Sequence, residues 1–312
     1  MSRILITGAG GFVGRYLCEH LLKKEDSVIL GIDLAEELFF QKEHDAERLL
    51  YRQTNLTDSS AIRSILSGFQ PEYIFHLAAF SSVGQSWKQP VDTFVNNTNI
   101  FLNIVDAVRE LALPCRVLSI GSSEEYGGPC PPAYTEDSPL AGNSPYAAAR
   151  ISQEILSKLY ADHLGVDVVM TRSFNHFGPR QRTQFVIPSY VERLLEVKRN
   201  GGKGQMITGN TDIVRDFLDV RDVVEAYALI LEKGKKGEIY NVCSGVGISL
   251  KDIIVKLSEI IGVDVECVRD ESLIRPFDNP VVIGDNSKLK ALGWVQRYSL
   301  DKTLKEMTEE RR

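Results

Sequence analysis

The sequence predicts an α/β protein, in which a doubly wound parallel sheet is followed by a smaller α/β lobe. Two observations support this fold class. Up to about residue 175, short runs rich in β-branched residues alternate with helical patterns, which is typical of βαβ units. The first apolar run, residues 3–6, passes directly into closely spaced glycines, as a buried strand does when it turns into a helix. We expect the two parts to span residues 1–174 and 175–312, with later segments returning to the first part.

Glycines recur at every third position after the first predicted strand. Glycine permits a positive φ and a close backbone approach, and the first N–H groups of a helix attract negative charge. This turn can therefore hold the pyrophosphate of a dinucleotide, although a glycine turn can also serve packing alone. The residues of the turn that we expect to contact a dinucleotide are Gly8, Gly10, Gly11, Phe12, Val13 and Gly14.

A carboxylate is expected at the tip of the second strand. A helix predicted over Arg15–Lys24 and a second apolar run, residues 27–32, lead to Asp33 and Leu34. A carboxylate there can accept both hydroxyls of an adenosine ribose, and it repels a 2′-phosphate. We therefore favour NAD(H) over NADP(H), which stays possible. The alternative is that Asp33 is an ordinary turn residue at a strand end.

Further candidate contacts lie at the ends of the next two predicted strands, which are residues 52–56 and a run that begins at Tyr73 and is followed by two small residues, Ala78 and Ala79. An amide beside an apolar side chain can frame an adenine, and small residues let a cofactor pass close over a strand end. The predicted contacts at these strand ends are Asn55, Leu56, Leu77, Ala78 and Ala79.

A polar cluster follows the strand predicted over Arg116–Ile120. In an open α/β sheet, ligands bind at the carboxyl ends of the strands, which is where this cluster lies. Its candidate site residues are Ser122, Ser123 and Glu124. On the preceding helix, predicted over Val91–Leu111, Asn97 either faces the site or satisfies buried backbone groups.

A tyrosine and an arginine share one face of a helix predicted over Ala147–His163 and opened by Tyr146. Tyr146 and Arg150 are spaced i, i+4, and a loop rich in proline and glycine, residues 128–144, precedes them as a lid or a substrate wall. An ordinary phenol has a pKa near 10, and a fixed cation beside it favours the ionised form. The pair can therefore serve in acid–base catalysis. The alternative is an amphipathic helix with an exposed arginine.

The second part begins after the strand predicted over Val166–Arg172 and includes a helix predicted over Phe185–Lys198. Its arginines can bind a diphosphate, because the guanidinium fork matches phosphate oxygens, although each of them can also be a plain surface charge. These candidates are Arg180, Arg182, Arg215 and Arg275.

Composition excludes several classes of function. With 312 residues and a net charge of −6, the chain can bury a large core and does not have the basic balance that a nucleic-acid surface requires. The five cysteines are scattered and lack C-x-x-C spacing, which indicates neither a disulfide framework nor a zinc site. The first strand begins at residue 3, and no apolar run reaches the length of a membrane span. We therefore expect a cytoplasmic protein without a metal, a membrane anchor or a nucleic-acid partner.

Together, these motifs resemble those of the extended short-chain dehydrogenases/reductases that act on nucleotide-sugars and have a Rossmann-type fold. The resemblance covers essentially the whole chain. Segments 120–127, 174–179, 214–217 and 240–245 are most similar to the members that reduce a C4 ketone. The resemblance implies that NAD(H) or NADP(H) reduces GDP-4-keto-6-deoxy-D-mannose to GDP-D-rhamnose. No motif reads the nucleotide base by itself.

The resemblance also implies a role for each matching residue. Tyr146 is expected to give a proton to the C4 oxygen of the sugar, and Ser122 to hydrogen-bond the same oxygen. Arg150 is expected to contact the nicotinamide ribose, and Ser123 and Glu124 complete the catalytic set. The remaining implied contacts are Asn97 and Phe174 for the cofactor, and Ser81, Ser122, Glu124, Asn175, Arg180, Val186, Gly209, Arg215 and Arg275 for the substrate.

One position departs from the family. The family has lysine where this chain has Arg150, and arginine is bulkier, planar and always protonated. Arginine can supply a positive field but not a proton relay. The departure implies either reduced activity or a branch of the family adapted to arginine.

Other functions stay open. Glu124 can serve as the acid–base group of a nucleotide-sugar 4,6-dehydratase of the GDP-mannose type, and a 4-epimerase that returns its hydride is a further alternative. The alternative that is not an enzyme is a catalytically impaired regulator that binds a dinucleotide. Relatives often form homodimers through a four-helix bundle, which is expected here from Val91–Leu111 and Tyr146–His163.

Overall fold

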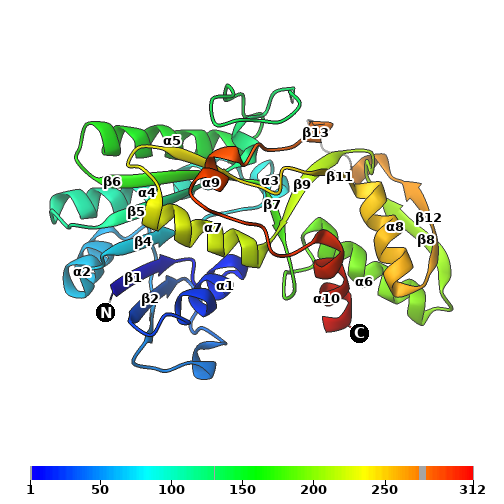
Figure 1. The fold of residues 1–312 in the computed structure, drawn as a ribbon, viewed down its shortest axis with the longest axis horizontal. Helices are drawn as coiled ribbons and strands as arrows, with labels where there is room; N and C mark the ends of the chain where they lie inside the picture. The colour runs from blue at the N-terminus through cyan, green and yellow to red at the C-terminus, as the bar shows by residue number, and fades with distance from the viewer. Residues whose placement is uncertain (1, 130, 274–278, 312) are drawn as a thin grey trace.

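A parallel sheet of seven strands, in the order β10-β6-β5-β4-β1-β2-β3, forms the centre of the protein (Figure 1). The computed structural model describes residues 2–129, 131–273 and 279–311. The strand order reverses between β1 and β4, and ligands bind at such a switch point in doubly wound folds. The strands of this sheet are β1 (Ser2–Thr7), β2 (Ser27–Asp33), β3 (Leu49–Gln53), β4 (Tyr73–His76), β5 (Arg116–Ser122), β6 (Asp167–Ser173) and β10 (Ile239–Val242).

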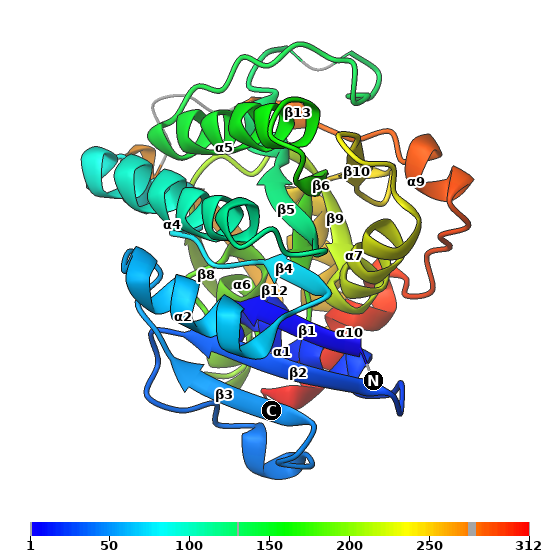
Figure 2. The same cartoon turned by 90° about the vertical axis from the view of Figure 1, so that its left-hand side faces the viewer.

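Helices cover both faces of this sheet (Figure 2). A strand that is buried on both faces reads as a continuous apolar run, and Ile4, Leu5 and Ile6 of β1 are all buried. One face packs against α2 (Ser59–Phe69), α4 (Pro90–Glu110) and α5 (Pro145–Asp162), and the other against α1 (Phe12–Leu21) and α7 (Val220–Lys233).

The first helix begins earlier than predicted. We expected Arg15–Lys24, whereas α1 spans Phe12–Leu21. Gly11 is its N-cap and has extended backbone, so the chain passes from the glycine turn into the helix without an intervening segment. This places the first N–H groups of the helix within the glycine turn.

The third strand also lies earlier than the predicted range of residues 52–56. The side-chain oxygen of Asn55, Oδ1, accepts hydrogen bonds from the N–H and the hydroxyl of Thr57, at 3.0 and 2.8 Å. This Asx turn ends the strand before Asn55. Asn55 and Leu56 therefore lie beyond the end of β3 rather than within it.

Most other predicted elements of the first part differ from the observed ones by one or two residues at their ends, which is the usual uncertainty of helix and strand limits. The central sheet confirms the predicted doubly wound α/β class. The division at residue 174 stays a prediction, because β10 and α7 come from later in the chain and complete the first sheet and one of its helical layers.

A second group of elements lies beside the carboxyl ends of the central strands (Figure 1). Strand β9 pairs with β7, β11 and β13, and β8 pairs in parallel with β12. Apolar residues of α6, α8 and α10 form a separate core here. The elements are β7 (Asn175–Phe177), α6 (Val186–Arg199), β8 (Lys203–Thr208), β9 (Val214–Asp219), β11 (Gly247–Ser249), α8 (Leu250–Ile261), β12 (Asp264–Arg269), β13 (Val281–Val282) and α10 (Leu300–Glu310).

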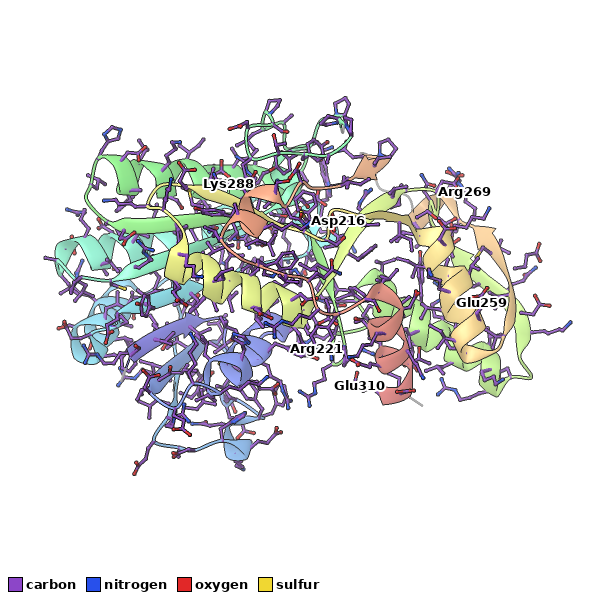
Figure 3. All side chains as sticks on the ribbon, viewed as in Figure 1. Asp216, Arg221, Glu259, Arg269, Lys288 and Glu310 are labelled. Atoms are coloured by element: carbon purple, nitrogen blue, oxygen red, sulfur yellow. The ribbon has the colours of Figure 1, made fainter. Side chains whose placement is uncertain are left out.

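Charged side chains join α7 to the C-terminal helix. Arg221, labelled in Figure 3, donates to Asp219 at 2.6 Å and to Glu306 of α10 at 2.7 Å. Asp219 also accepts from the hydroxyl of Thr303 at 2.6 Å, and Asp222 accepts from two backbone N–H groups ahead of α10. These carboxylates therefore brace the junction. Among the described residues, none of the helices has the length and apolar character needed to cross a bilayer.

Candidate active site

A cavity of about 670 Å³ lies where the carboxyl ends of the central strands face the second group of elements. It brings together most of the residues that the sequence predicted. These are Gly8, Gly11, Phe12, Val13, Gly14, Asp33, Leu34, Asn55, Leu56, Leu77, Ala78, Ala79, Ser81, Ser122, Glu124, Tyr146, Arg150, Phe174, Asn175, Val186, Gly209 and Arg215.

The glycine turn has a shape that side chains would obstruct. Gly8 has a φ of +71°, and a Cβ there would lie 2.9 Å from the backbone nitrogen of Ala78. A Cβ on Gly14 would lie 2.3 Å from the carbonyl oxygen of Gly8. Gly11 caps α1 without a side-chain hydrogen bond, so N–H groups of the first helical turn are left for a ligand. Gly8 and Gly14 therefore let backbone segments of the protein pack closely around the turn, and the N–H groups that start α1 can hold a pyrophosphate.

Gly10 has a structural role instead of lining the cavity. Its N–H donates to Asp33 Oδ2 at 2.9 Å, while the N–H of Leu34 donates to Asp33 Oδ1 at 2.7 Å. These bonds hold the carboxylate at the end of β2, where Asp33 lines the cavity. Oδ1 also accepts from the N–H of Ala35 at 3.3 Å, whereas Oδ2, among the described residues, accepts from Gly10 alone and can still accept from a hydroxyl group of a ligand.

Tyr146 and Arg150 form the predicted pair on one face of α5, and both are buried. Ser144 caps the helix by accepting from the N–H of Ala147 at 3.1 Å, and Pro145 occupies its first turn. Arg150 Nε donates to the Tyr146 hydroxyl at 3.1 Å, and its guanidinium carbon lies 5.2 Å from the centre of the tyrosine ring. The positive charge is therefore held next to the phenol oxygen.

The Ser122 hydroxyl faces the same cavity from the end of β5. Ser122 Oγ accepts from the N–H of Glu124 at 3.2 Å, and Glu125 Oε1 accepts from the N–H of Ser122 at 2.6 Å. These bonds form a capping box that fixes the short turn after β5. Ser123 is buried and does not line the main cavity. It lines a smaller one, together with Glu124 and other polar residues.

Tyr227 of α7 also lines the cavity, and we did not predict it from the sequence. Its hydroxyl lies 2.7 Å from Ser173 Oγ, and burial raises the pKa of Tyr227 well above its ordinary value, so this phenol stays protonated. The apolar spacing of Val223, Val224 and Ile230 in the same helix predicts that Tyr227 is a core residue. The sequence pattern therefore does not indicate that Tyr227 lines the cavity.

Two histidines near the site stay neutral. His76 lies at the end of β4, with Nδ1 at 3.0 Å from Thr7 Oγ1, and burial, followed by the charge of Arg150, lowers the pKa of His76 to about 3. His176 lines the cavity and stacks on Phe12 with the ring centres 6.3 Å apart. Burial lowers the pKa of His176 as well. Neither imidazole is therefore a proton donor at neutral pH.

Several other predicted contacts, Arg182 among them, do not line the cavity. Asn97 is wrong as a cofactor contact, because its buried amide accepts from the N–H of Phe80 at 2.8 Å and donates to the Phe80 carbonyl at 3.2 Å. Its neighbour Asn96 lines the cavity instead. Arg180 is also wrong, since its side chain is 46% exposed and pairs with Glu19. Arg275 lies outside the described residues.

On the opposite side of the cavity, Arg215 is buried in β9 and lies beside Asn175 of β7 in the smaller adjoining cavity. The next residue, Asp216, is labelled in Figure 3 and accepts from N–H groups of Ser244 and Gly245 at 2.8 and 2.9 Å. These bonds fix β9 against the loop after β10. Arg215 and Asn175 also line the main cavity.

The family model described as GDP-mannose 4,6 dehydratase matches residues 5–307. The chain belongs to this family. A GDP-6-deoxy-D-mannose reductase of Pseudomonas aeruginosa is 28% identical over 97% of this chain and 95% of that protein. The extended short-chain dehydrogenase/reductase family predicted from the motifs is thus confirmed.

Solved structures of the family have the same fold. The dTDP-glucose 4,6-dehydratase from Streptomyces venezuelae, with NAD and TYD bound, has a TM-score of 0.88 and 26% identity over 99% of this chain and 96% of that one. A structure of RMD from Pseudomonas aeruginosa complexed with NADPH has a TM-score of 0.83 and 26% identity over 99% and 98%. Members of the family are therefore NAD(P)-dependent enzymes, as predicted.

Proposed function

We propose that this chain reduces the C4 ketone of a nucleotide-sugar with NAD(P)H, and that it converts GDP-4-keto-6-deoxy-D-mannose to GDP-D-rhamnose. The observation that carries this proposal is the contact between the Tyr146 hydroxyl and the Arg150 guanidinium at 3.1 Å, in the cavity that Ser122 and the glycine turn also line. The likeness to the Pseudomonas aeruginosa reductase supports the choice of substrate.

The chain's own residues manage the proton in this reaction. A nicotinamide cofactor supplies hydride to C4 of the sugar when it is bound. Tyr146 donates its hydroxyl proton to the carbonyl oxygen, which becomes the alcohol, and Ser122 donates a hydrogen bond to the same oxygen. Because Ser122 Oγ already accepts from Glu124, its own hydrogen is left for the substrate. Arg150 stabilises the phenolate until a proton from water restores the phenol.

We propose that NAD(H) is preferred. Asp33 is held at the end of β2 by bonds from Gly10 and Leu34, and a carboxylate at this place favours ribose hydroxyls over a 2′-phosphate. RMD from Pseudomonas aeruginosa is complexed with NADPH, so both cofactors need to be tested with this chain. The ratio of kcat/KM for NADH and NADPH tests it.

The diphosphate of the substrate is proposed to lie between the two groups of elements. Arg215 supplies a guanidinium and Asn175 an amide, and both reach the cavity from strands of the second part. Guanidinium groups bind phosphate oxygens through paired hydrogen bonds. Arg215→Ala is expected to raise KM for the nucleotide-sugar while KM for NADH stays unchanged.

The decisive experiment follows nicotinamide absorbance during incubation with GDP-4-keto-6-deoxy-D-mannose and NADH. A reductase consumes one NADH for each sugar reduced. The proposal fails if the sugar is converted without net consumption of NADH, because a dehydratase or an epimerase returns its hydride. Dinucleotide binding without turnover of any keto-sugar would instead support the regulator.

A 4,6-dehydratase is the second candidate, and the position of Glu124 favours it. Glu124 lines the main cavity next to Ser122, where a carboxylate can remove a proton from the sugar. The fold similarity to the Streptomyces venezuelae dehydratase adds support. With GDP-mannose and NAD, this function predicts a 4-keto product, and Glu124→Gln should abolish its formation.

A homodimer is proposed through α4 and α5, which pack side by side (Figure 2). Large apolar side chains on these helices are exposed, such as Val91 at 71% and Ile155 at 53%. A second pair of helices would cover them as a four-helix bundle. Light scattering should give a dimer mass for the native chain and a lower mass for Ile155→Asp. The cytoplasm, which holds NAD(H) and nucleotide-sugars, is the proposed location.

A further inference from the structure

A buried chain of hydrogen bonds lies behind Arg150 and is built from neutral groups. Gln153, one helical turn further along α5, is 1% exposed, and its Oε1 accepts from Arg150 Nη1 at 2.7 Å. Its Nε2 donates to Ser119 Oγ at 2.9 Å and to the carbonyl of Ile120 at 3.2 Å. Ser157 Oγ lies 2.8 Å from Ser119 Oγ and continues the chain.

These contacts define the plane of the guanidinium group. Arg150 Nε donates to the Tyr146 hydroxyl, and Nη1 donates to the Ile120 carbonyl at 3.0 Å as well as to Gln153. Among the described residues, no acceptor is recorded for Nη2, and Arg150 lines the cavity. Nε is therefore committed to the phenol and Nη1 to the protein, which leaves the Nη2 hydrogens for a ligand.

The neutrality of Gln153 matters as much as its position. A carboxylate at this depth would form an ion pair with Arg150 and weaken the positive field at the phenol oxygen. A carboxylate is in fact the next residue of the helix, but both oxygens of Glu154 accept from Arg172, at 2.7 and 2.8 Å. The helix thus gives the amide to Arg150 and the carboxylate to Arg172.

We infer that Gln153 is a positioning residue for the Tyr146–Arg150 pair, one that allows an arginine to serve where the family has a lysine. It holds the guanidinium plane with the phenol at one edge and the cavity at the other, and it leaves the full positive charge to act on Tyr146. The inference rests on the proposed function, because it assigns the pair a role in proton transfer.

Two substitutions of similar size test it, one by a neutral side chain and one by a negatively charged side chain. Gln153→Met removes the acceptor, and we expect kcat to fall about tenfold, the effect of losing one hydrogen bond to a charged group, with KM unchanged. Gln153→Glu keeps an acceptor but adds a charge, and we expect a larger fall together with a shift of the kcat–pH profile to higher pH. Ser152→Ala, which removes a hydroxyl bonded back to Ala148, is the control on the same helix.

A double substitution separates positioning from simple loss of packing. Arg150→Lys alone is expected to lower kcat, because lysine leaves the buried Gln153 acceptor without its partner. Gln153→Ala, combined with Arg150→Lys, removes that acceptor and should recover part of kcat. Unchanged kcat and pH profiles for Gln153→Met and Gln153→Glu, in proteins whose melting temperatures stay native, would overturn the inference.

A readout without substrate separates this inference from the proposed function. The ionisation of Tyr146 can be followed by NMR in protein carrying 13Cζ-tyrosine, with Tyr146→Phe identifying its signal. Gln153→Glu should move the midpoint of this titration to higher pH even if no keto-sugar is reduced. If the wild type turns over no substrate while the midpoint moves, the proposed function fails and the positioning role stands. If the midpoint stays in place, the positioning role fails.

Discussion

Replacing Glu125 by glutamine should remove one component of the pH dependence of stability. Glu125 has no exposed surface, its Oε1 accepts from the N–H of Ser122 at 2.6 Å, and its Oε2 is buried without a donor. The carboxyl beside it is that of Glu154, which Arg172 holds. Two carboxylates only accept, so a hydrogen bond between them requires a proton on one of them.

The sign follows from the environment of Glu125. Burial, and then the charge of Glu154, raise the pKa of Glu125 well above its ordinary value of 4.5, while the Ser122 N–H and Arg172 oppose this shift only in part. Tyr126 stacks on Arg172 from the other side, with 4.8 Å between guanidinium carbon and ring centre. A raised carboxyl pKa gives stability that is complete below pH 4.5 and is lost as the pH rises toward the folded-state value.

The magnitude is set by one proton. Between the unfolded and folded pKa values of one group, the free energy of unfolding falls by about 1.4 kcal/mol per pH unit. In Glu125→Gln, the amide oxygen can accept from the Ser122 N–H and the NH₂ group can donate to Glu154, so no proton is required. The variant should therefore gain stability relative to the wild type as the pH rises above 4.5.

Urea unfolding of both proteins across this pH range measures the effect, because contributions from all other groups cancel in the difference. Glu47→Gln, at an exposed carboxylate, is the matched control and should give a difference independent of pH. A Glu125→Gln difference that is as flat as the control would refute the raised pKa of Glu125. Since Glu125 holds the N–H of Ser122, the wild type should also lose activity reversibly at alkaline pH before the variant does.

Other substitutions test the remaining parts of the site. Tyr146→Phe should lower kcat about 10²- to 10⁴-fold, because the proton donor is lost, while dinucleotide affinity by fluorescence titration stays within a few-fold. Asp33→Ala should raise the NADPH to NADH ratio of kcat/KM about tenfold or more, and an unchanged ratio would count against a ribose contact. Gly8→Ala should destabilise the fold by about 1 to 2 kcal/mol or more, since φ is +71° and the Cβ meets the Ala78 nitrogen. Gly68→Ala in α2 meets no atom within 4 Å and should show no such loss on thermal unfolding.

The glycine turn and the Tyr146–Arg150 pair were predictable from the sequence because each depends on local geometry. A strand that turns into a helix between Gly8 and Gly14 can adopt only a few backbone conformations. An i, i+4 spacing places two side chains on one face of a helix, whatever surrounds them. Ser122 follows by topology, since the carboxyl ends of parallel strands share an edge. These features therefore agree between sequence and structure.

The errors arise where tertiary contacts choose between adjacent residues. Asn96 and Asn97 are adjacent on α4. The position of Phe80 decides which of the two amides hydrogen-bonds to the backbone, and that amide is the one of Asn97. Arg180 follows a glycine and a proline in a phosphate-binding context, yet it adopts a φ of +67° and pairs with Glu19 of α1. The periodicity of apolar residues in the sequence does not predict these contacts.

Two arginines beneath the site show how the fold distributes charge. Arg172 donates to both carboxylate oxygens of Glu154, so its charge is neutralised and the pair holds β6 against α5. Arg150 is bound by a phenol, a carbonyl and an amide, none of which carries a negative charge. No carboxylate among these partners neutralises the positive charge of the second arginine, so its field acts on Tyr146, whose hydroxyl it contacts. An arginine in place of lysine is compatible with catalysis in this chain because α5 keeps its carboxylate away from that arginine.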